Sequence, residues 1–164
     1  MRWLLHFVVL GAALLPWSSA RAEVLGQAQS VALGANPVRV VLGSGPPVAA
    51  RLKALPTGRR VFLVIRHLRA TAPPGVVYDL FLGLDTDSKP HGHPNTQPIG
   101  AINFFAAVPP NDTAPTISFD ITKNLLALSA SNGLRNDMAI TIVPAGVPAA
   151  DAGTVLGSVE LVLE

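Results

Sequence analysis

The sequence predicts an all-β fold: an antiparallel β-sandwich or jelly-roll-like barrel of about seven strands, with one short helix near residues 122–131. Short runs of apolar residues alternate with polar ones, as half-buried strands require. Fifteen prolines and fourteen glycines, spread over 164 residues, interrupt these runs at short intervals. A single Leu-rich stretch near the C-terminus breaks the alternation with a helical pattern.

The first 22 residues have the features of a cleaved secretory signal. A basic residue, Arg2, precedes the apolar run 3–15, and the tripeptide A-R-A at 20–22 fits the small-residue rule for cleavage. The run is shorter than the ~20 residues of a membrane helix, and an uncleaved N-terminal anchor is the alternative. We therefore expect an exported protein, periplasmic or secreted, that has no membrane contact after cleavage. A flexible segment over 23–36 and one domain over 37–164 are expected to follow.

Charge and composition exclude several classes of function. Of twelve basic and ten acidic residues, Arg2 and Arg21 fall in the leader, so the mature chain has ten of each and no basic stripe suited to nucleic acid. The absence of cysteine excludes thiol chemistry and Cys-ligated metals. The first half of the mature chain is basic, and every acid except Glu23 lies from Asp79 onward. Either these halves face each other in one domain, or the basic half docks on an acidic partner.

Seven apolar runs are the expected strands: 37–43, 59–68, 76–84, 99–108, 116–121, 137–144 and 154–164. The run at 59–68 is apolar on both faces, which favours a buried strand. In the last run, Val155, Val159, Leu161 and Leu163 share one face. The alternation predicts a core that includes Ile117, Phe119, Ile140, Ile142, Val159 and Leu161. The aromatic side chains of Tyr78, Phe104 and Phe105 are also expected inside.

The helix expected near 122–131 has an apolar side formed by Leu125, Leu126 and Leu128. Either Asp120 or Thr122 suits its N-terminal cap, and Gly133 suits its C-terminal cap. Short helices of this kind can carry a chain across one end of a sandwich, from one sheet to the other.

The polar loop 85–98 contains the one metal-like feature, His91-Gly92-His93. Imidazole pairs suit copper, but a site needs further ligands, for which only Asp85 and Asp87 lie close in sequence. The competing interpretation is a solvated loop, so copper is a possible ligand and no other cofactor is expected. No nucleophile elbow and no phosphate-binding loop is present, which argues against an enzyme.

The stretch from Val77 onward resembles the C-terminal domain that follows the dicopper domain in plant polyphenol oxidases and many bacterial tyrosinases. "VYDLFLGL" is similar to the family's Lys-Phe-Asp-Val strand, although Gly83 stands where the family usually has Asn. "IGAINFF", "FDITKNLLAL", "NDMAITIVPAG" and "LGSVELVLE" resemble its later segments in the same order. The residues that match its motifs are Tyr78, Asp79, Phe81, Gly100, Phe119, Asp120 and Pro144. Upstream runs resemble bacterial members, so the likeness covers roughly 37–164.

In that family the domain packs over the dicopper site and shields it. The resemblance therefore implies a non-catalytic shielding or binding module, here without the helical bundle and six histidines that oxidase chemistry needs. Its expected partner is a separately encoded tyrosinase-like dicopper oxidase. Two other hypotheses stay open: an exported copper-binding protein that uses His91 and His93, and a structural module without its ancestral partner.

Overall fold

The structure, a computed structural model, describes residues 22–42, 50–51, 54–55, 58–83, 96–108, 114–131 and 138–164. Within these residues the chain forms eight strands, the α-helix α2 and the 3₁₀ helix η1. The strands are β1 (Glu23–Ala32), β2 (Val38–Val41), β3 (Val61–Arg69), β4 (Tyr78–Leu82), β5 (Gln97–Ile102), β6 (Ile117–Asp120), β7 (Ala139–Pro144) and β8 (Val155–Leu163). The helices are η1 (Phe105–Ala107) and α2 (Thr122–Ala130).

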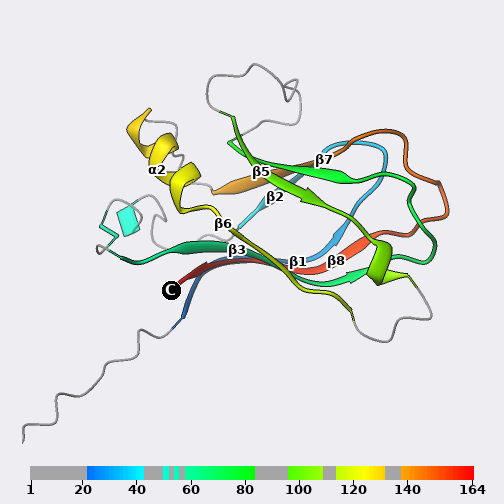
Figure 1. Cartoon of the computed structure of the whole chain (residues 1–164), viewed down its shortest axis with the longest axis horizontal. Helices are drawn as coiled ribbons and strands as arrows, with labels where there is room; N and C mark the ends of the chain where they lie inside the picture. The colour runs from blue at the N-terminus through cyan, green and yellow to red at the C-terminus, as the bar shows by residue number, and fades with distance from the viewer. Residues whose placement is uncertain are drawn as a thin grey trace, which may run out of the picture.

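The strands form two four-stranded sheets that face each other (Figure 1). Sheet A has the order β1-β8-β3-β6, and sheet B has the order β2-β7-β4-β5. Every strand pair in both sheets is antiparallel. This architecture confirms the all-β sandwich predicted from the alternating runs, with one strand more than the seven expected.

The additional strand is β1, which lies in the segment expected to be flexible. It pairs with β8 from Glu23 opposite Leu163 to Ala32 opposite Val155. The small and polar residues of this segment give no strong alternation, because β1 is an edge strand with much of its surface in solvent. Backbone hydrogen bonding to β8 stabilises this strand, together with burial of Leu25 and the packing of Ala28 and Val31 against the core. Residues Glu23–Ala32 of the segment expected to be flexible therefore form an edge strand of sheet A.

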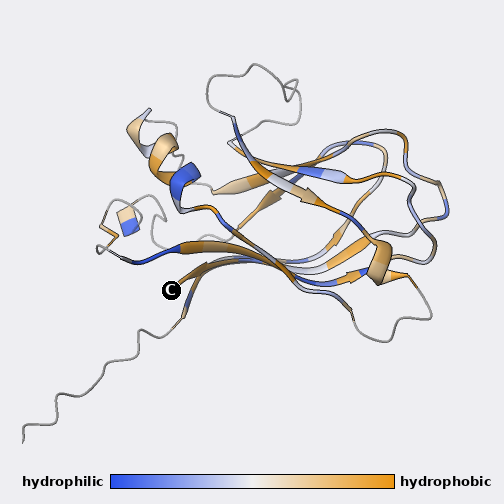
Figure 2. Cartoon of the chain, in the orientation of Figure 1, coloured by the Kyte–Doolittle hydropathy of each residue, from blue (hydrophilic) through white to orange (hydrophobic). Residues whose placement is uncertain are grey.

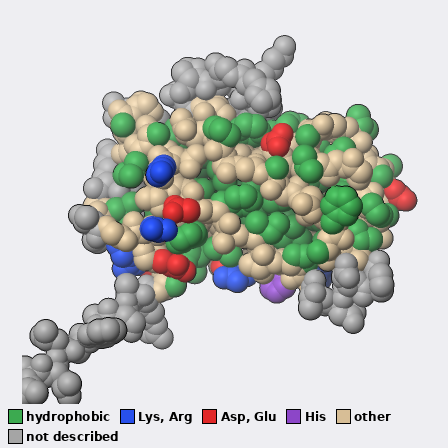
Figure 3. All heavy atoms as spheres, in the orientation of Figure 1, with side chains coloured by type: hydrophobic (Ala, Val, Ile, Leu, Met, Phe, Trp, Pro, Cys, Tyr) green, Lys and Arg blue, Asp and Glu red, His purple; other side chains and the backbone are tan. Residues whose placement is uncertain are grey.

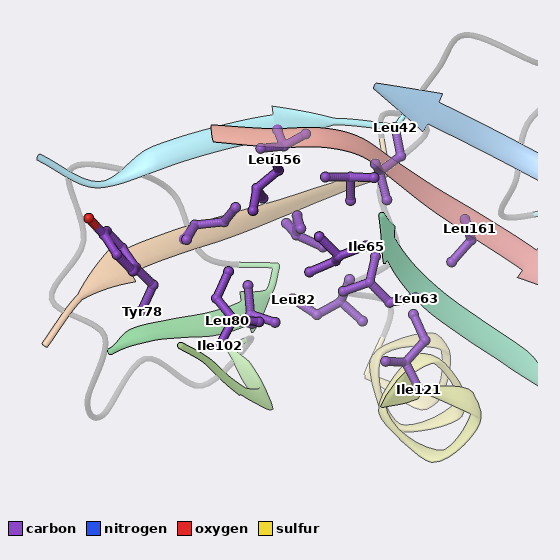
Figure 4. Close-up of a cluster of buried hydrophobic side chains, with 14 of the residues drawn as sticks. Leu42, Leu63, Ile65, Tyr78, Leu80, Leu82, Ile102, Ile121, Leu156 and Leu161 are labelled. Carbon is purple, nitrogen blue, oxygen red and sulfur yellow. The ribbon is translucent and has the colours of Figure 1, made fainter. Parts of the chain in front are cut away.

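The hydrophobic core lies between the two sheets. Figure 4 shows Leu63 and Ile65 of β3 meeting Leu80 and Leu82 of β4 across this space, and all four side chains are fully buried. Hydrophobic residues recur along the strands of both sheets (Figure 2). Because each buried Leu or Ile contributes about 1.5–3 kcal/mol, this layer is the main source of stability.

The predicted core residues divide by their position in the sheets. Ile140, Ile142, Val159 and Leu161, which lie in inner strands, are buried as expected. Ile117 and Phe119 pack against the core but are only partly buried. Their strand, β6, is the edge of sheet A, so one side of each side chain lacks a neighbouring strand.

The prediction of which β8 residues face the core is wrong at the start of the strand. Leu156, not Val155, lies in the core with Val159 and Leu161. Gly157 adds a residue between Leu156 and Val159, which shifts the alternation by one position. Val155 is consequently on the outer face of sheet A, although the prediction places it beside Val159.

The helix α2 forms where the sequence predicts it and connects β6 of sheet A with β7 of sheet B. Leu125 and Leu128 are buried, whereas Leu126 is exposed and does not belong to the apolar side. Asp120 Oδ1 accepts a hydrogen bond from the Thr122 N–H at 3.0 Å. Because the helix begins at Thr122, the N-cap position is Ile121, which makes no side-chain cap hydrogen bond, so neither Asp120 nor Thr122 is the cap residue expected from the sequence. Gly133, the expected C-terminal cap, lies outside the described residues.

The expected leader also lies outside the described residues, apart from Ala22. In the part of the chain that the structure describes, no helix is long and apolar enough to cross a membrane.

Candidate functional site

The histidines expected to bind copper cannot be placed, because His91 and His93 lie outside the described residues, as do Asp85 and Asp87. Among the residues that are described, no cluster of three or more His, Cys, Asp or Glu side chains is arranged to hold a metal. The copper hypothesis for this loop therefore stays a prediction.

Tyr78, the aromatic residue of the first family motif, has a structural role. It is buried in β4, and its hydroxyl lies 3.2 Å from Thr154 Oγ1, which donates in turn to the Leu33 carbonyl at 3.0 Å. Its ring meets the Phe104 ring edge to face, with centroids 5.7 Å apart and an interplanar angle of 75°. These contacts link β4 to the ends of β1 and β5, where the sandwich is otherwise open.

The other sheet B motif residues lie around Tyr78. Asp79 and Phe81 alternate with the core residues of β4 and therefore face away from the core. Phe81 is nevertheless buried, while Asp79 is partly exposed. Pro144 ends β7 directly opposite Tyr78, where it has no N–H to donate to the ladder.

Gly100, Phe119 and Asp120 organise the side of the sandwich where β5 and β6 approach each other. A Cβ on Gly100 would lie 2.7 Å from Phe119 Cε1, so the aromatic ring of β6 rests directly on the glycine of β5. The next residue, Asp120, accepts a hydrogen bond from the Thr122 N–H at the start of α2 and lies 3.7 Å from Arg60. Hydrogen bonds from the Thr122 hydroxyl and backbone N–H lower the pKa of Asp120, and Arg60 adds to this shift. These contacts give Gly100, Phe119 and Asp120 a role in the packing between β5, β6 and α2.

A hollow of about 270 Å³ lies at the end of the sandwich near Tyr78. It is lined almost entirely by apolar groups, from Pro73, Pro74, Gly75, Val76, Val77, Asn103, Phe104, Phe105 and Val108. We call this surface the apolar hollow. Its walls come from the β3–β4 connection and from the turn after β5, so two separate parts of the chain build it.

Phe105 stands at this hollow with 91% of its surface exposed, whereas the adjacent Phe104 is 1% exposed. The turn η1 sets this difference. The Ala107 N–H donates to the Phe104 carbonyl, and the Ala70 N–H donates to the Ala107 carbonyl at 3.1 Å. Both Phe104 and Ala107 are buried as a result, which leaves Phe105 outside.

The prediction that Phe105 lies in the core is therefore wrong. The expected strand over 99–108 ends at Ile102, and Asn103 Oδ1 accepts the Phe105 N–H at 3.2 Å as the chain turns. Two adjacent phenylalanines cannot both face inward from a strand, which is the signal in the sequence that one of them is exposed.

Exposed apolar residues extend the apolar hollow on its other side. Val77 is 41% exposed, and its carbonyl accepts the Ala145 N–H at 2.9 Å. That contact places the turn after β7 beside the hollow, and Val147 in this turn is 87% exposed. In Figure 3 the right half of the visible face is mainly green and tan, with the Lys and Arg side chains at the left and along the lower edge. Such a surface is suited to contact with another apolar surface.

Three arginines of the first half have acidic partners within the domain. Arg51 contacts Glu23, Arg60 lies 3.7 Å from Asp120, and Arg66 Nε lies 3.1 Å from Glu160 Oε2. The pairs of Arg60 and Arg66 join the basic half to the acidic half. This arrangement supports the first interpretation of the charge segregation, in which the halves face each other within one domain.

No known protein-family profile matches the sequence, and no curated protein matches it either. Solved structures are similar in fold. A recombinantly expressed latent aurone synthase, a polyphenol oxidase co-crystallised with hexatungstotellurate(VI), matches 96% of this chain at 16% identity and a TM-score of 0.50. The fold is shared with a polyphenol oxidase.

The match spans only 32% of that polyphenol oxidase, so this chain corresponds in length to about a third of it. Two further structures of latent aurone synthase match at 14% and 15% identity, with TM-scores of 0.46 and 0.42. They cover 81% and 82% of this chain, and 26% and 24% of theirs. At 16% identity, the match to the first of these structures concerns the fold alone.

Proposed function

We propose that this chain is an exported, non-catalytic binding module that docks on a separately encoded dicopper oxidase of the tyrosinase type. Docking places the sandwich across the path to the copper pocket, so it slows substrate access without taking part in the chemistry. Two observations support the proposal: the resemblance of the motifs from Val77 onward, and the fold shared with about a third of an oxidase described as latent.

The observation that carries the proposal furthest is the apolar hollow with Phe105 at its edge. An aromatic side chain with 91% of its surface in water has no role in the stability of its own domain. In protein interfaces, exposed aromatic anchors surrounded by apolar groups contribute most of the binding free energy. The apolar hollow presents Phe105 and Val77, and Val147 is exposed in the turn beside it, which makes this end of the sandwich the expected docking surface.

The apolar hollow also changes the kind of docking contact that we expect, from a charged contact to an apolar one. Arg60 and Arg66 already have acidic partners within the domain, so they are less available for an acidic surface of another protein than the sequence suggests. Docking through the apolar hollow buries apolar area instead, so its affinity should depend little on ionic strength.

The test uses the mature chain and the dicopper oxidases of the same organism. We expect the immobilised chain to retain one of these oxidases and to slow oxidation of a bulky diphenol more than that of a small one. The purified chain alone, with or without added copper, should oxidise neither substrate.

Two variants locate the surface. Phe105→Ala should weaken the association roughly tenfold or more, as truncation of an aromatic anchor does. Leu126→Ala is the matched control, because Leu126 is 53% exposed on α2, at the opposite end of the sandwich in Figure 1. It should leave the affinity within about twofold. Failure to bind any dicopper oxidase, or equal effects of the two variants, would overturn the proposal.

A further inference from the structure

Three neighbouring strands of sheet A carry one extra residue at the same level. In a regular strand every second residue faces the core, but here successive core residues are three apart. The pairs are Ala28 and Val31 in β1, Ile65 and Leu68 in β3, and Leu156 and Val159 in β8. The register is unchanged across this level, because Val159 lies opposite Ile65 and Ala28, and Leu156 lies opposite Leu68 and Val31.

The extra residues form a row across the sheet, Ser30 in β1, Gly157 in β8 and His67 in β3. Ser30 has φ 51° and His67 has φ 55°, and among the described residues these are the non-glycine positions with positive φ. A Cβ on Gly157 would lie 2.7 Å from His67 Cβ, so a glycine is required between them. Residues held in this sparsely populated conformation cluster at binding sites, where the surrounding structure imposes it.

The row opens a hollow of about 440 Å³ on the outer face of sheet A. We call it the polar hollow. Arg66, His67 and Arg69 of β3 line one side, Gln29 and Ser30 of β1 line the other, and Ser158 lies between them on β8. It shares no lining residue with the apolar hollow.

Hydrogen bonds inside the polar hollow fix one arginine and leave another available. Glu160 Oε2 accepts from Arg66 Nε at 3.1 Å, and Glu160 Oε1 accepts from Ser158 Oγ at 2.9 Å. Both carboxylate oxygens are thus engaged, and Arg66 is held in position. Arg69 is exposed, and among the described residues no carboxylate lies within ion-pair distance of it.

The lining therefore offers more positive charge than negative charge. Two guanidinium groups face one engaged carboxylate, and the amide of Gln29, the hydroxyl of Ser30 and the imidazole of His67 add hydrogen-bonding groups. Guanidinium groups bind tetrahedral and planar oxyanions through paired N–H donors. No aromatic side chain lines the hollow, so it lacks the stacking surface typical of sites for neutral rings.

We infer that the polar hollow binds a small organic anion through its phosphate or sulfate group, with Arg66 and Arg69 as the anion ligands. The volume is in the range of small-molecule sites and exceeds what the anionic group alone would fill. The site lies on strands rather than loops, which favours a fixed arrangement of the donors.

The test is an amide NMR titration of the mature chain with inorganic phosphate, inorganic sulfate and phenyl phosphate, and with phenol as the uncharged control. Saturable shifts are expected at Ser30, His67 and Gly157 for the anions, with phenyl phosphate binding tightest because it also fills the remaining volume. Phenol should cause no shift there. A response to phosphate and sulfate but equal binding of phenyl phosphate would locate recognition in the anionic group alone and overturn the organic-ligand part of the inference.

Arg69→Gln and Arg60→Gln form a matched pair. Both remove one exposed arginine at or next to an end of β3, but only Arg69 lines the polar hollow. Loss of one charge-assisted contact should weaken anion binding roughly tenfold for Arg69→Gln. The Arg60→Gln variant should bind within about twofold of the parent, apart from a uniform charge effect.

Equal weakening in both variants, or shifts scattered over the surface without saturation, would overturn the inference. The amide spectrum of each variant reports directly whether it is folded. The result is independent of the proposed docking, because the two surfaces share no residue, so either can fail while the other stands.

Discussion

The two hollows of this domain differ in how they are built as well as in their chemistry. The apolar hollow is made by connections that follow β3 and β5, and its residue with positive φ is a glycine, Gly75. The polar hollow is made by three hydrogen-bonded strands and forces a serine and a histidine into that conformation. Connections can adjust to a protein surface, whereas strands hold donors in place for a small ligand. The construction of each hollow therefore agrees with the kind of partner inferred from its chemistry.

The largest expected effect is a difference in stability between variants of the two phenylalanines that line the apolar hollow. Phe104→Ala should lower the free energy of unfolding by about 3–5 kcal/mol, because it removes a buried ring and its contact with Tyr78. Phe105→Ala should change it by less than about 0.5 kcal/mol, since that ring is exposed. Urea titration of both variants measures the difference. Similar losses in the two would mean that Phe105 belongs to the core and not to a docking surface.

The second effect tests the construction of the polar hollow. Gly157→Ala places a Cβ 2.7 Å from His67 Cβ and 3.3 Å from the carbonyl oxygens of Arg66 and His67. Overpacking of this kind should cost about 1–3 kcal/mol and shift the amide signals of the three-residue row. Gly34→Ala is the control, because a Cβ there meets nothing within 4 Å. If Gly157→Ala were as harmless as the control, the row would not be the constrained element described above.

A third effect on stability is expected at Asp120, which lines neither hollow, and it gives a reference against which the effects at the hollows can be compared. Asp120→Ala should cost about 0.5–1 kcal/mol at neutral pH, because it removes the acceptor of the Thr122 N–H at the start of α2. The pKa of Asp120 is lowered in the folded protein, so its contribution is present above the unfolded pKa of about 3.9 and is lost as pH falls through the lower folded value.

The difference in unfolding free energy between parent and Asp120→Ala should therefore shrink in acid. Asp120→Asn keeps an acceptor oxygen for the Thr122 N–H and should retain most of this contribution at both pH values. Urea titrations at neutral pH and near pH 3 measure this. A difference that stays constant in acid would show that the carboxylate charge plays no part.

The smallest expected effect is a difference between the two hollows in how strongly binding depends on ionic strength. Between about 50 and 300 mM salt, association through the apolar hollow should change by less than about twofold, whereas phosphate binding to the polar hollow should weaken severalfold. Parallel binding measurements at the two salt concentrations decide it. If added salt weakened docking as strongly as it weakens phosphate binding, the docking interface would have to lie on the charged surface of the domain and not at the apolar hollow.

The sequence was sufficient for the class of fold because alternation is a local property of each strand. The runs that became β3, β4, β7 and α2 carry their pattern within ten residues. The pattern fails where structure depends on a neighbour. β1 forms because β8 offers a free edge, and Ile117 and Phe119 are only partly buried because no strand lies beyond β6.

Neither hollow could be predicted from the sequence, because both depend on contacts between distant parts of the chain. The facing of Phe105 is decided by hydrogen bonds between the η1 turn and Ala70, which lies far away in the chain. The extra residues of sheet A can be recognised only when β1, β8 and β3 are aligned. Each strand has one extra residue at the same level, so the register between the strands is preserved. The strand over 154–164 alone gave the wrong position for Val155. His91 and His93 lie outside the described residues, and their copper binding remains a prediction from sequence.

The pairing of β1 with β8 has a mechanical consequence. Glu23 lies opposite Leu163, so the first strand and the last strand meet at the same point of sheet A, as Figure 1 shows near the C-terminal label. A force that pulled these two ends apart would load the hydrogen bonds between β1 and β8 one after another, as a zipper opens, instead of all together. The domain would then lose β1 at low tension. Held by one end only, the same domain would carry no load across that pair of strands and would keep both of its surfaces intact.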